Sequence, residues 1–216
     1  MQTVWYHNCK MCLKPNSRPK KATLFHILNH CDAFLGDEER FRWRHDSVLN
    51  YITLAIKEDQ PENIKIYADL EGHKINGKTI PQNIVVSASL PDLVVIDNST
   101  SPPTVYLFEL TICFERQENI ERAHNFKYNR YSSLSQDIKD AGYQCKNIPF
   151  EVGSRGHLTL ENKSILSIIH KLCQPKTKFS KFWQNISKTS LLCSYATYLS
   201  RHDSWTTTPL LLPVKK

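Results

Sequence analysis

Residues 91–114 read PDLVVIDNSTSPPTVYLFELTICF, and they predict an antiparallel β-hairpin at the centre of a sheet. The apolar runs 93–96 and 105–114 flank a turn that is rich in Asn, Ser, Thr and Pro. Because the turn sets the register of a hairpin, pairing joins positions whose numbers sum to roughly 201–203. Asp92 is therefore expected to lie opposite residues 109–111.

The second strand of this hairpin carries an acidic residue in an apolar setting. Alternation places Glu109 and Thr111 on one face with Leu107 and Cys113, and it leaves the other face to Tyr106, Phe108, Leu110, Ile112 and Phe114. Apolar residues on both faces are typical of an interior strand. A glutamate in such a strand costs free energy unless it is paired or bound to a metal. We therefore expect Glu109 to have a charged partner.

Lys127 is the cation that the sequence places nearest to these acids. Residues 117–141 show the spacing of one amphipathic helix, with an apolar face formed by Ile120, Ala123, Lys127, Tyr131, Leu134 and Ile138. A lysine in the middle of a buried face usually has an acidic partner. Each residue also has an ordinary interpretation: a strand-start aspartate, a structural or edge glutamate, and a lysine that reaches water.

Together, Asp92, Glu109 and Lys127 suit hydrolysis of a phosphodiester. Carboxylate oxygens are the ligands that Mg²⁺ prefers, and Mn²⁺ accepts the same ligands. The bound cation neutralises charge that develops on the phosphate. An ammonium group can stabilise the phosphate or the attacking water as a point charge.

A cluster of soft metal ligands lies near the N-terminus. Cys9 and Cys12 form a Cys-x2-Cys pair, and His26 and Cys31 follow as His-x4-Cys. This pattern is typical of a structural zinc site, which stabilises a segment too short to bury a core of its own. His30 is an alternative fourth ligand because it lies one helical turn after His26. Unliganded cysteines with a surface histidine are the ordinary alternative. A complete ligand set disfavours a zinc-dependent hydrolase, which needs an open position.

Charge is distributed unevenly along the 216 residues: residues 1–45 carry +4, residues 46–169 carry −4, and residues 170–216 carry +7. Basic ends around an acidic centre suit a nuclease whose terminal segments bind the phosphates of DNA. Solvated surface lysines explain such a distribution of net charge as well. The residues expected to contact DNA are Lys14, Lys20, Lys21, Arg42 and Arg44, with the stretch Lys176–Lys188 as an auxiliary.

Seven scattered cysteines are typical of a reducing compartment, so a nuclear or cytoplasmic location is expected. The sequence has no apolar run that would span a membrane.

The remaining apolar patterns predict helices at 38–56, 162–173 and 189–201, and strands at 64–70, 84–88 and 143–152. This order predicts an α/β fold with a central mixed sheet flanked by helices. The expected units are a zinc knuckle (1–36), a catalytic core (37–160) and a basic helical extension (161–216).

Several motifs occur in a characteristic order. After the Cys-Cys-His-Cys pattern come FRWRHDSVL (41–49), PDLV (91–94), FELT (108–111) and AHNFKY (123–128). Over roughly residues 9–157 this order resembles the C-terminal region of non-LTR retrotransposon polyproteins, in which a zinc knuckle precedes a restriction-like endonuclease of the PD-(D/E)xK superfamily.

The resemblance implies a restriction-endonuclease-like fold in which Asp92 and Glu109 bind catalytic Mg²⁺ or Mn²⁺. The superfamily's usual lysine, two positions after the second acid, is replaced by Thr111. In this element family the lysine is displaced onto the following helix, where Lys127 stands. The family nicks target DNA to prime a reverse transcriptase, so the implied partners are DNA, RNA and a reverse transcriptase from the same element. The chain is then a fragment, a relic or a freestanding descendant.

Two functions follow from these patterns. The first is a metal-dependent DNA endonuclease. The alternative is a non-catalytic nucleic-acid-binding module with a vestigial nuclease fold. Retention of both acids and the lysine favours the endonuclease, because a decaying relic tends to lose one of them.

Overall fold

The computed structural model describes residues 8–12, 18–31, 33, 35, 39–203, 205 and 209–211. Its regular elements, in chain order, are η1 (Lys10–Cys12), α1 (Leu24–Asn29), α2 (Arg40–Lys57), β1 (Ile64–Ala68), β2 (Leu93–Asp97), β3 (Thr104–Cys113), α3 (Gln117–Arg130), α4 (Ser132–Asp140), β4 (Gln144–Gly153), α5 (Leu160–Cys173) and α6 (Phe179–Leu199). No helix of the described part is long and apolar enough to cross a membrane.

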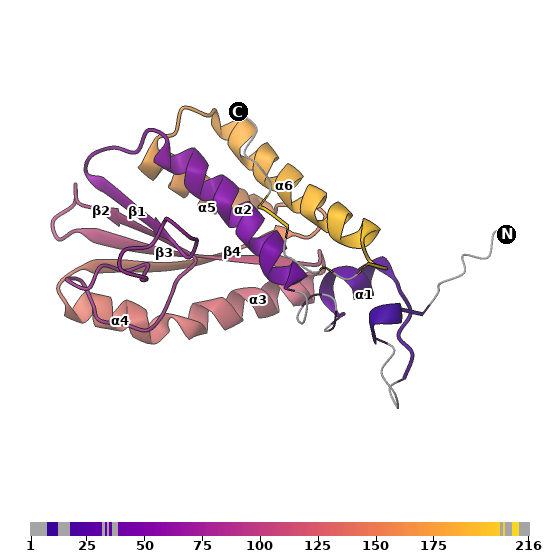
Figure 1. The fold of residues 1–216 in the computed structure, drawn as a ribbon. Helices are drawn as coiled ribbons and strands as arrows, with labels where there is room; N and C mark the ends of the chain where they lie inside the picture. Colours follow the sequence, from indigo (N-terminus) through magenta and orange to yellow (C-terminus); the bar gives the residue numbers. More distant parts are fainter. Residues whose placement is uncertain are drawn as a thin grey trace.

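A mixed sheet in the order β1-β2-β3-β4 forms the centre of the molecule. The pairs β1–β2 and β2–β3 are antiparallel, whereas β3 and β4 run parallel. Helices α2, α5 and α6 cover one face of the sheet, and α3 and α4 lie along the other (Figure 1). The predicted α/β class with a mixed sheet between helices is therefore confirmed.

The predicted hairpin register is also confirmed. Leu93 pairs with Phe108 and Asp97 pairs with Thr104, so the chain positions of Asp92 and Glu109 are adjacent at the end of this ladder. The register follows from the turn, because its polar and proline residues cannot continue either strand.

The two faces of β3 contribute to two apolar cores, as the alternation predicts. Tyr106, Phe108, Leu110 and Ile112 belong to the larger core beneath α2, α5 and α6. Val105 and Leu107 belong to the smaller core, which contains Leu134 and Ile138 of α4. Leu166 of α5 and Phe182 and Ile186 of α6 are buried in the larger core, so the C-terminal helices help to cover the sheet.

The predicted helix over 117–141 is instead two helices that meet at Tyr131. This residue leaves helical geometry, with φ −108° and ψ 11°, and its buried ring donates a hydrogen bond from the hydroxyl to the Leu90 carbonyl. The smaller core contains α4 residues, whereas α3 buries none of its side chains. The N-terminal half of the expected apolar face, including Lys127, is therefore left beside a cleft.

Two other element predictions differ from the structure. Residues 84–88 form no strand and pair with none of the four strands of the sheet. Ile84 is buried in the smaller core, while Val86 is 84% exposed. Helix α6 begins at Phe179, ten positions before the expected residue 189. Of the stretch Lys176–Lys188, the lysines within α6, Lys181 and Lys188, are exposed, whereas Lys176 and Lys178 precede the helix.

Candidate functional site

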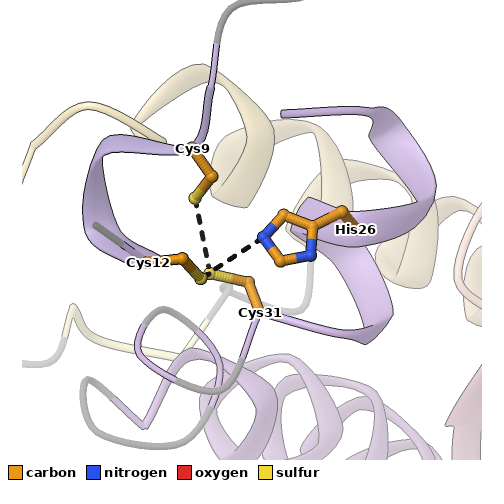
Figure 2. Close-up of side chains that lie close together, drawn as sticks. All are labelled: Cys9, Cys12, His26 and Cys31. Atoms are coloured by element: carbon orange, nitrogen blue, oxygen red, sulfur yellow. Dashed lines mark hydrogen bonds between the residues drawn. The ribbon is translucent and has the colours of Figure 1, made fainter. Parts of the chain in front are cut away.

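The N-terminal cluster brings four metal-ligand side chains together. One ligand atom from each of Cys9, Cys12, His26 and Cys31 lies within 4.8 Å of the others. Cys9 Sγ is 3.7 Å from Cys31 Sγ, and Cys12 Sγ is 3.3 Å from Cys31 Sγ and 3.4 Å from His26 Nε2 (Figure 2). Tetrahedral coordination with Zn–S bonds of about 2.3 Å separates two sulfurs by roughly 3.8 Å. The cluster can therefore bind a metal ion, and its ligands are compatible with structural zinc.

Local backbone interactions build this cluster. The Cys9 amide donates to the Lys20 carbonyl, which brings the Cys-x2-Cys turn against the segment before α1. Thr23 caps α1 by accepting a hydrogen bond from the His26 amide. Cys31 then lies just beyond the end of α1, buried beside the other ligands. His30 is exposed and lines a different cleft, so the structure favours the predicted His26 and Cys31 over this alternative ligand.

Asp92, Glu109 and Lys127 also converge. Lys127 Nζ lies 2.9 Å from Asp92 Oδ2 and 3.0 Å from Glu109 Oε2, so one ammonium group bridges both carboxylates. The main chain holds the acids in place: the Leu110 amide donates to Asp92 Oδ2 at 2.9 Å, and the Asp92 amide donates to Glu109 Oε1 at 3.1 Å. Glu109 is fully buried, and Asp92 is nearly so. Residues from β3, α3 and the start of β2 thus form one charged cluster.

His45 of α2 joins this cluster and is not among the site residues predicted from the sequence. Its Nε2 lies 3.3 Å from Asp92 Oδ2, and its Nδ1 lies 2.9 Å from Asp46 Oδ1. His45 and Asp46 belong to the motif FRWRHDSVL, and this was the available signal. Sequence spacing gives no indication that α2 crosses the sheet near Asp92, so the contact depends on tertiary packing.

The two acids have opposite pKa shifts. Burial and the charge of Asp92 raise the pKa of Glu109 to about 8, although Lys127 opposes this. Burial also tends to raise the pKa of Asp92, but the charges and hydrogen bonds of His45 and Lys127 outweigh it and hold the pKa well below its usual range. Burial tends to lower the pKa of His45, while Asp92 and Asp46 raise it to about 10. The two carboxylates differ because Asp92 contacts both His45 and Lys127, whereas the more deeply buried Glu109 contacts Lys127 alone.

An open cleft of about 760 Å³ lies against this cluster. Its wall includes Asp92, Lys127 and His45, together with residues of α1, α2, β3 and α3. Asn29 and His30 bring the metal-binding unit to the same cleft. A phosphate group entering the cleft would meet carboxylates that can hold a cation and an ammonium group that can contact an oxygen.

The residues expected to contact DNA differ in their exposure and in the surface that they line. Lys20 and Lys21 are exposed and line a second hollow of about 580 Å³ beside α1. Arg42 lines the large cleft with 65% of its side chain exposed, 3.4 Å from Asp46. Lys14 lies outside the described residues.

The prediction for Arg44 is wrong, because its side chain is completely buried and cannot reach a DNA backbone. Its guanidinium donates to the Leu28 carbonyl at the end of α1 (3.0 Å) and to Ser194 Oγ of α6 (3.2 Å). Arg40, one turn earlier and also fully buried, donates to the Ser200 and Asp203 carbonyls beyond the end of α6. Both arginines therefore satisfy carbonyls at helix C-termini, where cations are favoured.

A search with models of known protein families found no match to this chain, and a search of curated proteins found no significant match. A functional interpretation therefore depends on the geometry of the two clusters and the cleft between them.

Proposed function

We propose that this chain is a metal-dependent DNA endonuclease that hydrolyses phosphodiester bonds and carries a structural zinc at Cys9, Cys12, His26 and Cys31. The observation that supports this most directly is the convergence of Asp92, Glu109 and Lys127 beside an open cleft, whose wall includes Asp92 and Lys127. Its elements, two carboxylates and one amine, are those expected for this chemistry from the residue types alone.

The acidic pair fits a divalent cation. Glu109 is fully buried, and its pKa is raised first by that burial and then by the charge of Asp92, which Lys127 offsets only in part. Asp92 and Glu109 would hold Mg²⁺ or Mn²⁺, and when bound, the ion supplies positive charge against the phosphate oxygens. Lys127 contributes a hydrogen-bond donor and a charge to the phosphate or to the attacking water. His45 orients Asp92 through the hydrogen bond to Oδ2.

The order of the motifs supports a more specific proposal. The chain resembles the zinc knuckle and restriction-like nuclease region of non-LTR retrotransposons, whose nucleases nick target DNA. On this proposal DNA is the main partner, and RNA or a reverse transcriptase of the same element are further partners.

Cleavage of supercoiled plasmid DNA tests the proposal directly. The zinc-loaded chain should cut with added Mg²⁺ or Mn²⁺ and remain inactive without added divalent cation. Asp92→Ala and Glu109→Ala should abolish cleavage, and Lys127→Ala should lower the rate about 10²-fold, as expected for loss of one charge-stabilising group. Glu118→Gln, which changes an exposed carboxylate on α3, is the matched control. Wild-type cleavage by Asp92→Ala would overturn the assignment.

One observation favours a non-catalytic alternative. Lys127, Asp92 and Glu109 form a closed ion-pair network that also ties α3 to the sheet. In a vestigial nuclease fold this network would be purely structural, and the chain would bind nucleic acid without cutting it. Metal-dependent cleavage that disappears in Asp92→Ala excludes this alternative.

A further inference from the structure

One face of α3 forms a wall of the cleft. The cleft-lining residues of this helix are Asn119, Arg122, Ala123, Phe126, Lys127 and Arg130. Their spacing of three and four places them on a single side of the helix. Lys127 is held against the sheet by the two acids, whereas Arg122, Phe126 and Arg130 on this face are exposed. These three side chains are therefore available to a ligand that enters the cleft.

This face is cationic around an exposed aromatic ring. Lys127 is engaged by the two acids, whereas neither Arg122 nor Arg130 forms an ion pair with any carboxylate in the described part of the chain. Phe126 is 64% exposed. The ring thus has positive charges on both sides along the helix, an arrangement that favours an anionic ligand with flat apolar surfaces.

A second exposed ring lines the same cleft from another helix. Phe41, near the start of α2, is 42% exposed and is followed by Arg42, whose side chain is 65% exposed. Phe41 and Arg42 both line the cleft, as Phe126 and Arg122 do. Aromatic rings beside cations in a groove are the combination by which proteins hold single-stranded nucleic acid, since the cations follow the backbone while bases stack on the rings.

We infer that the cleft binds single-stranded DNA and that Phe126 stacks on an unpaired base close to the catalytic cluster. In duplex DNA each base is covered by its neighbours, so a side-chain ring gains a stacking partner only where a base is unpaired. The inference deepens the proposed function by naming its substrate class, and it rests on that function for the choice of DNA.

Binding without cleavage tests this inference. The zinc-loaded full chain is titrated, with no added divalent cation, into a single-stranded oligonucleotide of about 12 nucleotides, a length within the range that one binding groove covers. The oligonucleotide carries a fluorescein label or an internal 2-aminopurine. The comparison ligand is the same oligonucleotide annealed to its complement. Fluorescence anisotropy gives the affinities, and 2-aminopurine quenching reports stacking.

The wild-type chain should bind the single strand more tightly than the duplex and should quench 2-aminopurine. Phe126→Ala should weaken single-strand binding roughly 5- to 100-fold and remove the quenching, while duplex affinity stays unchanged. Phe126→Tyr, which keeps a ring, should retain both. Tyr128→Ala is the matched control, because Tyr128 is 52% exposed on the same helix but lies outside the cleft lining.

Equal losses for single strand and duplex in Phe126→Ala, or no loss at all, would overturn the inference. Tighter binding of an oligoribonucleotide of the same sequence would overturn the choice of DNA. Because alanine forms helices more readily than phenylalanine and Phe126 is exposed, the variant is expected to stay folded, which circular dichroism checks. Cleavage is not the readout, so a chain that stacks on bases but cuts nothing would refute only the proposed function.

Discussion

Replacing Glu109 by glutamine should change how stability depends on pH. The carboxyl group of Glu109 is fully buried beside Asp92, and its pKa is raised from 4.5 to about 8. The folded protein therefore holds this proton at pH values where the unfolded chain releases it. Stability is fully present below pH 4.5 and is lost as the pH rises from there towards 8. Glu109→Gln removes the titrating group, so the variant should not show this loss of stability as the pH rises.

The size of the effect follows from the linkage between protons and folding. Each pH unit inside this window removes about 1.4 kcal/mol, so the wild-type protein should lose about 2 kcal/mol between pH 5 and pH 6.5 relative to Glu109→Gln. The other three groups of the cluster contribute little there. Lys127 has a pKa raised above 10.5, so its contribution is lost only at higher pH. Asp92 has a lowered pKa, and the stability that it adds is complete once the pH exceeds its unfolded pKa of 3.8. His45 has a raised pKa, and its contribution is lost only as the pH rises from 6.5 to about 10.

Urea unfolding followed by tryptophan fluorescence measures the difference, with zinc present and no other divalent cation added. Glu62→Gln is the control, because Glu62 is exposed and should give a curve parallel to that of the wild type. Saturating Mg²⁺ should flatten the wild-type curve, because a bound cation favours the ionised carboxylate. Parallel curves for Glu109→Gln and wild type between pH 5 and 6.5 would refute the electrostatic description of this cluster.

Three further predictions concern the metal cluster and the basic residues. Purified protein should contain about one equivalent of zinc by elemental analysis. The Cys31→Ala variant should lose this zinc and the His30→Ala variant should keep it. The reverse result would make His30, instead of Cys31, the fourth zinc ligand. Arg44→Met should lower the free energy of unfolding by about 1–3 kcal/mol in urea titrations, since the buried Leu28 carbonyl loses its hydrogen-bond donor. Arg42→Met changes an exposed arginine and should have little effect. Similar losses in both variants would contradict the role of Arg44 as a donor to the end of α1. Replacing Lys20 and Lys21 together by alanine should reduce the slope of log affinity for DNA against log salt by about 1 to 2, and an unchanged slope would remove both residues from the DNA-binding surface.

Features that depend on neighbouring residues or on one turn follow from the amino-acid sequence alone. Alternation and the turn composition of 98–104 fix the hairpin register, and the register alone brings Asp92 beside Glu109. The spacing of Cys9, Cys12, His26 and Cys31 similarly predicts a cluster that the structure brings within 4.8 Å. Helical periodicity places Lys127 on the side of α3 that faces the sheet. These predictions succeed because backbone geometry over a few residues dictates them.

Other features depend on which distant segments of the chain meet in the folded protein. Arg40 and Arg44 are basic residues in a polar stretch of sequence, yet both are buried at the ends of α6 and α1, where they donate hydrogen bonds to carbonyl oxygens. Contact between His45 and Asp92 requires α2 to lie against β3. At the helix break, the Tyr131 hydroxyl donates a hydrogen bond to the distant Leu90 carbonyl. The cleft likewise depends on tertiary structure, because its wall combines residues of α1, α2, β3 and α3. The free energies behind these choices come from long-range burial and hydrogen bonding, which no local pattern of residues encodes.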